Sequence, residues 1–237
     1  MTVAAERELV VVGAGGFGKE TVEAVRALNA AGAHWRLAGY LDDEPARHGT
    51  MIDGVPVLGG TGELDNMPDV SVVVCTGRPD NYVSRPRIVE ALGLPPERYA
   101  TIIHPSASVS TTSRVGPGTV LLAQTVLTAA VTVGSHVAIM PHVIMTHDDV
   151  IGDFATMASG VCLGGNVQVG RCAYIGAGAL VREQRSIGSC ALVGMGAVVT
   201  RDIPPHEVWA GVPARYIRKA NAVAPQSAWS SLRERTR

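Results

Sequence analysis

The sequence predicts an α/β domain followed by a parallel β-helix, and two observations carry that prediction. From Ile103 the chain divides into consecutive hexads without insertion, and the first residue of every hexad through Val199 is aliphatic. Before the hexads, an apolar run at residues 9–12 leads into a glycine-rich segment at 13–18, which a helix-forming stretch follows. A chain of 237 residues has room for both units.

A second period of 18 residues sets the architecture of the repeat region. Glycine recurs at this interval after a valine or isoleucine, at Gly116, Gly134, Gly152, Gly170 and Gly188. Three hexads therefore make one turn, in which each hexad gives a short strand and a corner, and the first and fifth positions point inward. The stacked turns should make a prism about 27 Å tall, at about 4.8 Å per turn. A β-sandwich would have turns of uneven length, so the unbroken period argues against one.

The N-terminal hundred residues have the element order of a nucleotide-binding unit. The glycines of 13–18 permit a tight turn and let a phosphate approach the N-terminus of the following helix. Asp42 and Asp43 follow the second apolar strand, where a carboxylate can accept hydrogen bonds from a ribose or a base. The domain is too short for the two halves that bind NAD, which favours a single nucleotide or nucleotide sugar. The alternative is a small α/β domain that only packs on the prism. The expected elements are strands at 9–12, 35–41 and 70–75 and helices at 19–29 and 83–94.

Composition excludes several classes of function. The formal net charge of −1 provides no field that would attract nucleic acid or an acidic membrane. No apolar run approaches the roughly 18 residues of a membrane span, and residues 1–8 contain no apolar signal region, so we expect a cytoplasmic protein. The cysteines show no CxxC spacing, so neither a zinc ribbon nor a redox motif is predicted.

His147 is the best candidate for a catalytic residue. It occupies the third position of its hexad, so its side chain should point outward near a corner. Acyl transfer from a thioester to an amine or hydroxyl requires a base, and neutral imidazole suits this role at about pH 7. Asp148 is the natural carboxylate to fix the imidazole tautomer and stabilise the imidazolium. Asp149 occupies an inward fifth position, which is normally apolar, so its carboxylate must be paired, protonated or turned outward. A charged residue at an inward position beside His147 indicates a functional site.

Two other functions share the predicted prism. A metal enzyme of the γ-carbonic anhydrase type places three histidines around zinc, and His142 and His147 have a compatible spacing. The third ligand should lie two turns before His142, but that position is Ser106, and His104 is off register. A non-catalytic assembly scaffold would explain the repeats but not the carboxylates beside His147. Acyl transfer is therefore favoured, and no metal ion is expected.

An ordered set of motifs resembles a known protein family. The set comprises Gly13-Ala-Gly-Gly-Phe-Gly18, Gly39-Tyr-Leu-Asp-Asp43, His147-Asp148, Gly164-Gly-Asn166, Gly176-Ala-Gly178 and Gly211-Val-Pro-Ala-Arg215. Over roughly residues 8–219 the chain resembles the bacterial sialic acid O-acetyltransferase and nucleotide-4-amino-sugar N-acetyltransferase family of hexapeptide-repeat proteins. The resemblance implies a left-handed β-helix, a homotrimer, and acetyl-CoA or another acyl-CoA bound as co-substrate between neighbouring prisms. The implied acceptor is a nucleotide sugar or amino sugar, acylated at an amino or hydroxyl group.

The same resemblance implies a division of the chain and roles for single positions. Residues 1–100 would form a Rossmann-like nucleotide-sugar-binding domain, 101–217 the acyltransferase β-helix and 218–237 a C-terminal tail. His147 would be the general base, oriented by Asp148. The positions implied for coenzyme A are Thr156, Gly165, Ala177, Met195 and Arg215, and those implied for the nucleotide are Gly13, Gly15, Gly16, Asp42 and Asp43. The chain departs from the family pattern at Thr156, where some relatives carry a second histidine near the thioester.

Overall fold

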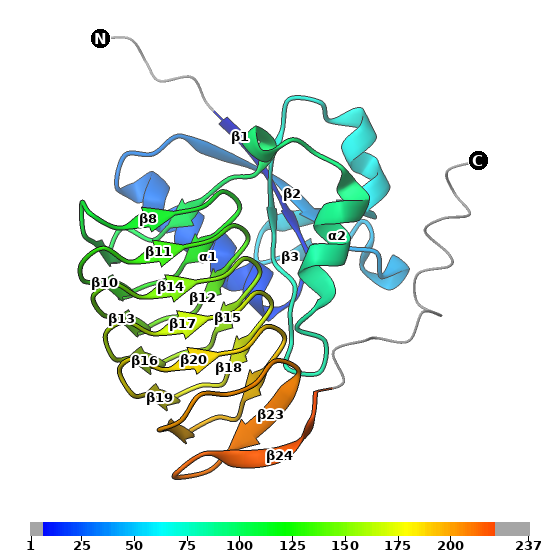
Figure 1. Ribbon diagram of the computed structural model, residues 1–237. Helices are drawn as coiled ribbons and strands as arrows, with labels where there is room; N and C mark the ends of the chain where they lie inside the picture. Colours follow the sequence, from blue (N-terminus) through cyan, green and yellow to red (C-terminus); the bar gives the residue numbers. More distant parts are fainter. Residues whose placement is uncertain (1–6, 221–237) are drawn as a thin grey trace.

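The computed structural model describes residues 7–220, which form an α/β domain packed against a three-sided prism of stacked turns (Figure 1). Residues 1–6 and 221–237, including most of the predicted C-terminal tail, lie outside the described residues. The predicted order of an α/β unit followed by a β-helix is confirmed. Among the described residues, no helix is both long enough and apolar enough to cross a membrane.

The α/β domain contains a five-stranded sheet in the order β3-β4-β2-β1-β5. Its elements are β1 (Arg7–Val12), α1 (Gly16–Ala30), β2 (Trp35–Leu41), η1 (Pro45–Arg47), β3 (Met51–Ile52), β4 (Val55–Gly59), η2 (Thr61–Asn66), β5 (Ser71–Val74), α2 (Ser84–Leu92) and η3 (Pro96–Arg98). Strand β1 pairs in parallel with both β2 and β5, and its last four side chains, at residues 9–12, are buried. Parallel strands buried on both faces read as continuous apolar runs, which is why β1 and β5 were predictable from the sequence.

The sequence prediction missed the hairpin formed by β3 and β4. These strands pair antiparallel across a two-residue turn at Asp53 and Gly54, and both residues have positive φ (48° and 79°). An Asp-Gly pair favours this kind of turn because both central residues must adopt left-handed backbone angles. That dipeptide is therefore the signal that could have predicted the hairpin.

The prism has three sheets built from one strand per turn, and β24 adds an antiparallel edge strand to the domain-facing sheet. The domain-facing sheet contains β6 (Ile102–Ile103), β9 (Val120–Leu121), β12 (Ala138–Ile139), β15 (Thr156–Met157), β18 (Tyr174–Ile175), β21 (Leu192–Val193), β23 (Glu207–Ala210) and β24 (Arg215–Lys219). The second sheet contains β7 (Ser108–Val109), β10 (Val126–Leu127), β13 (Ile144–Met145), β16 (Cys162–Leu163), β19 (Leu180–Val181) and β22 (Val198–Val199). The third sheet contains β8 (Arg114–Val115), β11 (Thr132–Val133), β14 (Val150–Ile151), β17 (Gln168–Val169) and β20 (Ser186–Ile187).

The hexad register predicted from the sequence is the register of the structure. Paired residues in neighbouring turns are 18 apart, as in Thr132 with Val150 and Ala138 with Thr156. Most inward first and fifth positions contribute to one continuous apolar cluster along the prism. Corners are made by fourth positions with left-handed backbone angles, among them Asp148 (φ 62°) and Asn166 (φ 64°). Third positions, which include His147, therefore lie at the edge of a corner and face outward.

Arg85 joins the two parts of the molecule. Its side chain lies on α2 and is fully buried, and no carboxylate among residues 7–220 pairs with it. The guanidinium donates to the Thr76 carbonyl (2.6 Å) on the α/β side. On the prism side it donates to the carbonyls of His136 (3.0 Å) and Phe154 (2.9 Å). Burial lowers the pKa of Arg85 to about 10, so the group stays charged at neutral pH and the carbonyl dipoles hold it in place.

Candidate active site

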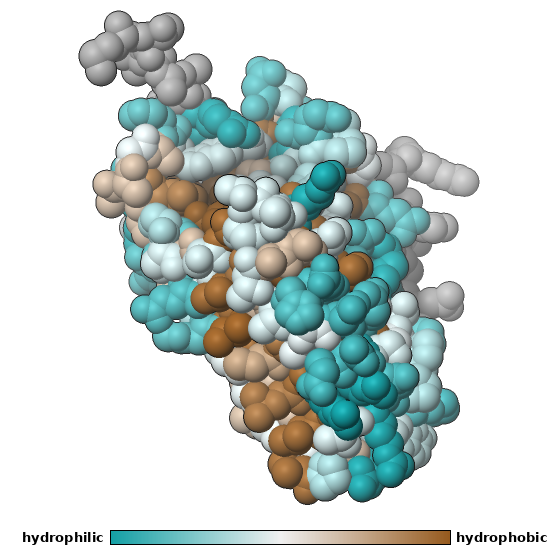
Figure 2. All heavy atoms as spheres, turned by 60° about the vertical axis from the view of Figure 1, so that its left-hand side comes forward, coloured by the Kyte–Doolittle hydropathy of each residue, from teal (hydrophilic) through white to brown (hydrophobic). Residues whose placement is uncertain are grey.

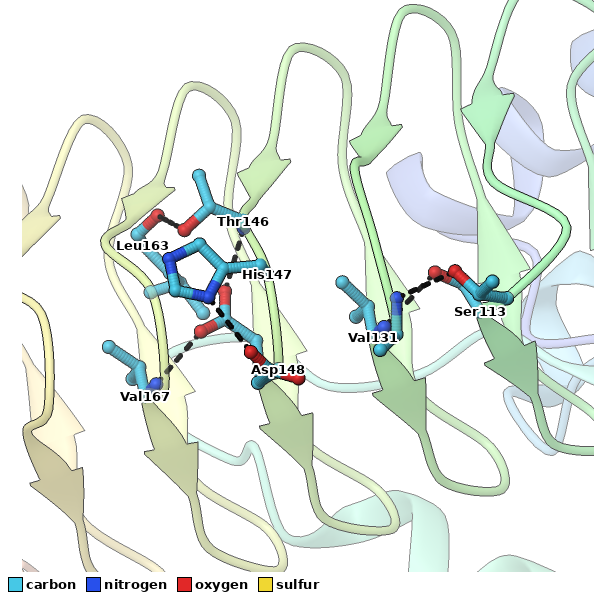
Figure 3. Close-up of polar contacts among 10 residues, drawn as sticks. Ser113, Val131, Thr146, His147, Asp148, Leu163 and Val167 are labelled. Atoms are coloured by element: carbon cyan, nitrogen blue, oxygen red, sulfur yellow. Dashed lines mark hydrogen bonds and ion pairs between the residues drawn. The ribbon is translucent and has the colours of Figure 1, made fainter.

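The candidate catalytic pair lies at the corner that joins the second and third sheets (Figure 3). The Nδ1 atom of His147 is 2.9 Å from Oδ2 of Asp148. Both side chains are exposed, His147 at 65% and Asp148 at 56%. The left-handed backbone at Asp148 turns the chain between β13 and β14, so adjacent residues can direct their side chains toward each other. With Nδ1 engaged by the carboxylate, Nε2 is the nitrogen left to accept a proton.

Gly165 of the next turn lies directly against the His147 ring. A Cβ atom at Gly165 would lie 2.3 Å from Nε2 and 2.4 Å from Cε1 of His147, so no side chain fits beside the ring in this position. The two turns are also joined by a hydrogen bond from the Asn166 N–H to the His147 carbonyl (2.9 Å). Within the described chain the Gly165 N–H donates no hydrogen bond. An unpaired donor therefore lies next to the candidate base.

Asp149 remains inside the prism beneath this corner, where its side chain is fully buried. Its Oδ2 accepts the N–H of Thr146 and its Oδ1 accepts the N–H of Val167, each at 2.8 Å. Burial raises the pKa of Asp149 to about 6, and the two backbone N–H groups act in the opposite direction. The sequence left three outcomes open for this residue, and the structure pairs it with two backbone donors.

The glycine-rich segment at residues 13–18 forms the tight turn that its sequence predicts. Gly13 has φ 102°, and a Cβ there would lie 2.8 Å from the carbonyl oxygen of Cys75. Gly18 packs so closely on the turn that a Cβ would lie 2.1 Å from the carbonyl oxygen of Gly13. Gly15 and Gly16, in contrast, have no neighbouring heavy atom within 4 Å of a built Cβ. These two glycines begin α1 and leave open space at the N-terminus of the helix, where unpaired N–H groups favour an anion.

Asp42 lies beside that turn and helps to shape it. Its Oδ2 accepts a hydrogen bond from the Ala14 N–H (2.8 Å). The guanidinium of Arg47 donates to the Ala14 carbonyl (2.8 Å) and lies 3.6 Å from the same carboxylate oxygen. Asp43 is exposed, and its Oδ1 accepts from the N–H (2.8 Å) and hydroxyl (3.0 Å) of Thr61. The structure brings Asp42 to the glycine turn, whereas Asp43 supports the start of η2.

The positions implied for coenzyme A are spread over different faces of one chain. Gly165 shares the corner of His147. Ala177 and Met195 share the other corner of the second sheet, and Met195 is 79% exposed. Thr156 is buried in the domain-facing sheet, where its hydroxyl oxygen accepts from Arg85 (2.8 Å). Arg215 is exposed on β24. A single prism therefore does not bring all five positions together.

No three His, Cys, Asp or Glu side chains gather in a metal-binding arrangement within residues 7–220. His142 lies at the corner between the domain-facing and second sheets, and His147 lies at the next corner. The spacing of these two histidines along the sequence therefore does not place them on one corner of a chain.

A prism of hexads with an exposed histidine–carboxylate corner and an N-terminal nucleotide-type turn defines a hexapeptide-repeat acyltransferase. The PglD N-terminal domain family matches residues 8–92. The acetyltransferase domain of PglB from Neisseria gonorrhoeae FA1090 is 31% identical, with a TM-score of 0.78 over 90% of this chain and 100% of that one. PerB from Caulobacter crescentus, solved in complex with CoA and GDP-perosamine, is 31% identical, with a TM-score of 0.78 over 90% of this chain and 98% of that one.

A curated relative gives a partial match. UDP-N-acetylbacillosamine N-acetyltransferase of Bacillus subtilis (strain 168) is 35% identical over 122 residues, which are 49% of this chain and 52% of that protein. The matched stretch thus spans about half the length of the curated relative. The two solved structures, in contrast, are matched over almost their whole length. The chain belongs to the sugar N-acyltransferase family of hexapeptide-repeat proteins, and its β-helix is of the left-handed kind.

Arg85 is the residue that the sequence analysis missed. It lies in a stretch that was expected to be helical, and nothing in its local pattern marks it as buried. Its environment is made by carbonyls of two prism turns that are distant in the sequence.

Proposed function

We propose that this protein transfers an acetyl group from acetyl-CoA to the amino group of a nucleotide-activated sugar. The observation that carries the proposal is the corner where His147 contacts Asp148 through Nδ1 and its ring lies against Gly165, whose N–H donates no hydrogen bond within the described residues. The similarity to PerB, solved with CoA and GDP-perosamine, supports both substrate classes. Another acyl-CoA and a hydroxyl acceptor are the nearest variants of this reaction.

The proposed chemistry needs only groups at this corner. The acceptor nitrogen attacks the thioester carbonyl, and Nε2 of His147 takes the proton that the nitrogen loses. Asp148 holds the imidazole through Nδ1 and stabilises the imidazolium. The N–H of Gly165 donates to the oxyanion of the tetrahedral intermediate. The C–S bond then breaks, and the thiolate of coenzyme A takes up the proton held by His147. The thioester is already activated, so no covalent enzyme intermediate is required.

The α/β domain would hold the other half of the acceptor. The phosphates of a nucleotide sugar would occupy the open space at Gly15 and Gly16, at the N-terminus of α1. The placement of Asp42 beside this turn supports a role in fixing the ribose or in shaping the turn that binds the phosphates. Buried Arg85 would then keep this domain at a fixed position relative to the prism.

The experiment that tests the function is a thiol-release assay with acetyl-CoA and a series of nucleotide 4-amino sugars. His147→Ala should lower kcat by about 10²- to 10⁴-fold, the usual contribution of a general base. Asp148→Asn should cost less, because the imidazole keeps part of its orientation. Both side chains are exposed and contribute nothing to the apolar column, so both variants should fold. A folded, trimeric His147→Ala variant with wild-type kcat from about pH 6 to about pH 9 would rule out His147 as the base.

A further inference from the structure

We propose that Asp149 is a positioning residue for the reaction: its buried carboxylate joins the His147 corner to the Gly165 segment of the next turn. The inference rests on the proposed function, because it concerns the geometry of the same base and the same oxyanion donor. Asp149 does not touch the substrates. It acts through the backbone that carries His147 and the backbone that carries Gly165.

The geometry places the carboxylate between these two segments. Thr146, whose N–H binds Oδ2 at 2.8 Å, immediately precedes His147. Val167, whose N–H binds Oδ1 at 2.8 Å, follows Gly165 by two residues. One fully buried group therefore holds both backbones that meet at the active corner. Dashed lines in Figure 3 mark the contacts made by the labelled Thr146 and Val167.

The backbone ladder of the prism is altered at this point. In the same column, the N–H of Thr128 donates to the carbonyl of Met145 and the N–H of Gly164 donates to the carbonyl of Val181. The equivalent bond from Thr146 to Leu163 is replaced, because the Thr146 N–H donates to Asp149 and its hydroxyl donates to the Leu163 carbonyl at 3.1 Å. Strands β13 and β16 are accordingly paired at one position only, Ile144 with Cys162.

The fold itself does not require a carboxylate at this position. Ser113 occupies the same inward column two turns earlier, and its hydroxyl oxygen accepts the N–H of Val131 at 3.1 Å (Figure 3). Val131 and Val167 themselves fill the column with apolar side chains. Arg185 is the other charged residue of this column, and its guanidinium lies 3.5 Å from the carboxylate of Asp202. A neutral group therefore satisfies the ladder elsewhere, and the additional bond to Thr146 is what Asp149 supplies.

The charges around Asp149 support the same inference. The titratable groups whose charges act on Asp149 are His147, which favours the ionised carboxylate, and Asp148, which opposes it. An ionised Asp149 binds the N–H groups of Thr146 and Val167 through charge-assisted hydrogen bonds, which are stronger than those a neutral acceptor makes. Because burial raises the pKa of Asp149 to about 6, this support should weaken as the pH falls below that value.

The test compares Asp149→Asn and Asp149→Ser with the wild type and with the control Ser113→Val. We expect the Asp149 variants to lower kcat by about 10- to 100-fold, with the KM for acetyl-CoA within about twofold, as for other residues that orient a catalytic group. The loss should be largest above about pH 6 and should narrow below it, where the wild-type carboxylate is itself protonated. Ser113→Val removes an acceptor from the same column and should leave kcat and its pH profile unchanged.

Asp149→Ser should fold, because Ser113 already occupies this column. It therefore carries the comparison by itself if Asp149→Asn does not fold. Unchanged kcat in the folded variants, or an equal loss in Ser113→Val, would overturn the inference. A wild-type enzyme that releases no thiol with any amino sugar would instead overturn the proposed function, and the inference with it.

Discussion

The contact between Gly165 and the His147 ring gives a prediction at the scale of single residues. Gly165→Ala should leave the fold intact, because the backbone of Gly165 lies outside the left-handed region and the nearest atoms to an added Cβ belong to an exposed ring. The methyl group should push the ring from its place against Gly165. A shift of about 1 Å at a reacting group can cost about 10²-fold in rate, and we expect a loss of that order in kcat.

Steady-state kinetics and thermal melting of the Gly165→Ala variant check this expectation. Gly62→Ala is a matched control, since an added Cβ there meets no atom within 4 Å and the backbone is not left-handed. Wild-type kcat in a folded Gly165→Ala variant would show that the ring position seen here is not the one used in catalysis.

Sequence reasoning reached His147 and Asp148 but not the bonds of Asp149. The hexad pattern places a third-position histidine outward, and adjacency alone pairs it with Asp148. The pattern also marked Asp149 as misplaced in an apolar column. Its partners, however, are backbone N–H groups of two different turns, and their directions depend on how the ladder is altered at Thr146. That alteration is a property of the stacked turns and has no local signal.

At the scale of elements, the turn between β1 and α1 should govern the affinity for the nucleotide sugar. Asp42→Ala removes the acceptor of the Ala14 N–H and should weaken nucleotide-sugar binding by about tenfold, the loss expected for a hydrogen bond to a charged group. Affinity for coenzyme A should stay nearly unchanged, because its expected positions, from Gly165 to Met195, belong to the prism.

Calorimetry with each ligand measures both affinities of the Asp42→Ala variant. Asp65→Ala serves as the control, since this carboxylate of η2 is exposed and is not among the side chains that bond the glycine turn at Ala14. Binding of NADH with no response to nucleotide sugars would refute the assignment of this domain. An equal loss of affinity for coenzyme A would show that the Asp42→Ala substitution perturbs the structure as a whole and not the nucleotide site alone.

The elements of the α/β domain were predictable to different degrees. Strand β2 begins and ends where its apolar run does, at Trp35–Leu41. Helix α2 starts at Ser84 with Pro86 in its first turn, where proline is tolerated, and it ends at the left-handed Gly93 (φ 57°). The hairpin of β3 and β4 was not predicted, because strands this short show little alternation of apolar and polar residues. Pairing of β4 with β2 stabilises the hairpin.

At the scale of the whole molecule, one face of the prism remains apolar. From β10 to β22 the outward side chains of the second sheet are Val126, Ile144, Cys162, Leu180 and Val198, whereas the first strand, β7, contributes Ser108. Ile144 and Leu180 are exposed at 38% and 47%, and Figure 2 shows apolar side chains gathered along the length of the prism. The same sheet separates the His147 corner from the corner of Ala177 and Met195. A second prism against this face would cover the stripe and bring the two kinds of corner together.

We therefore expect a homotrimer in which each active site lies between two chains. Leu180→Arg places a charge in the apolar stripe and should yield monomers, with kcat reduced at least about 100-fold because the neighbouring corner is lost. Gln168→Arg, on the exposed polar face of the third sheet, is the control and should remain trimeric and active. Light scattering at about micromolar concentration measures the oligomeric state of each protein. A wild-type enzyme that is monomeric and fully active under those conditions would contradict both the trimer and the site between chains.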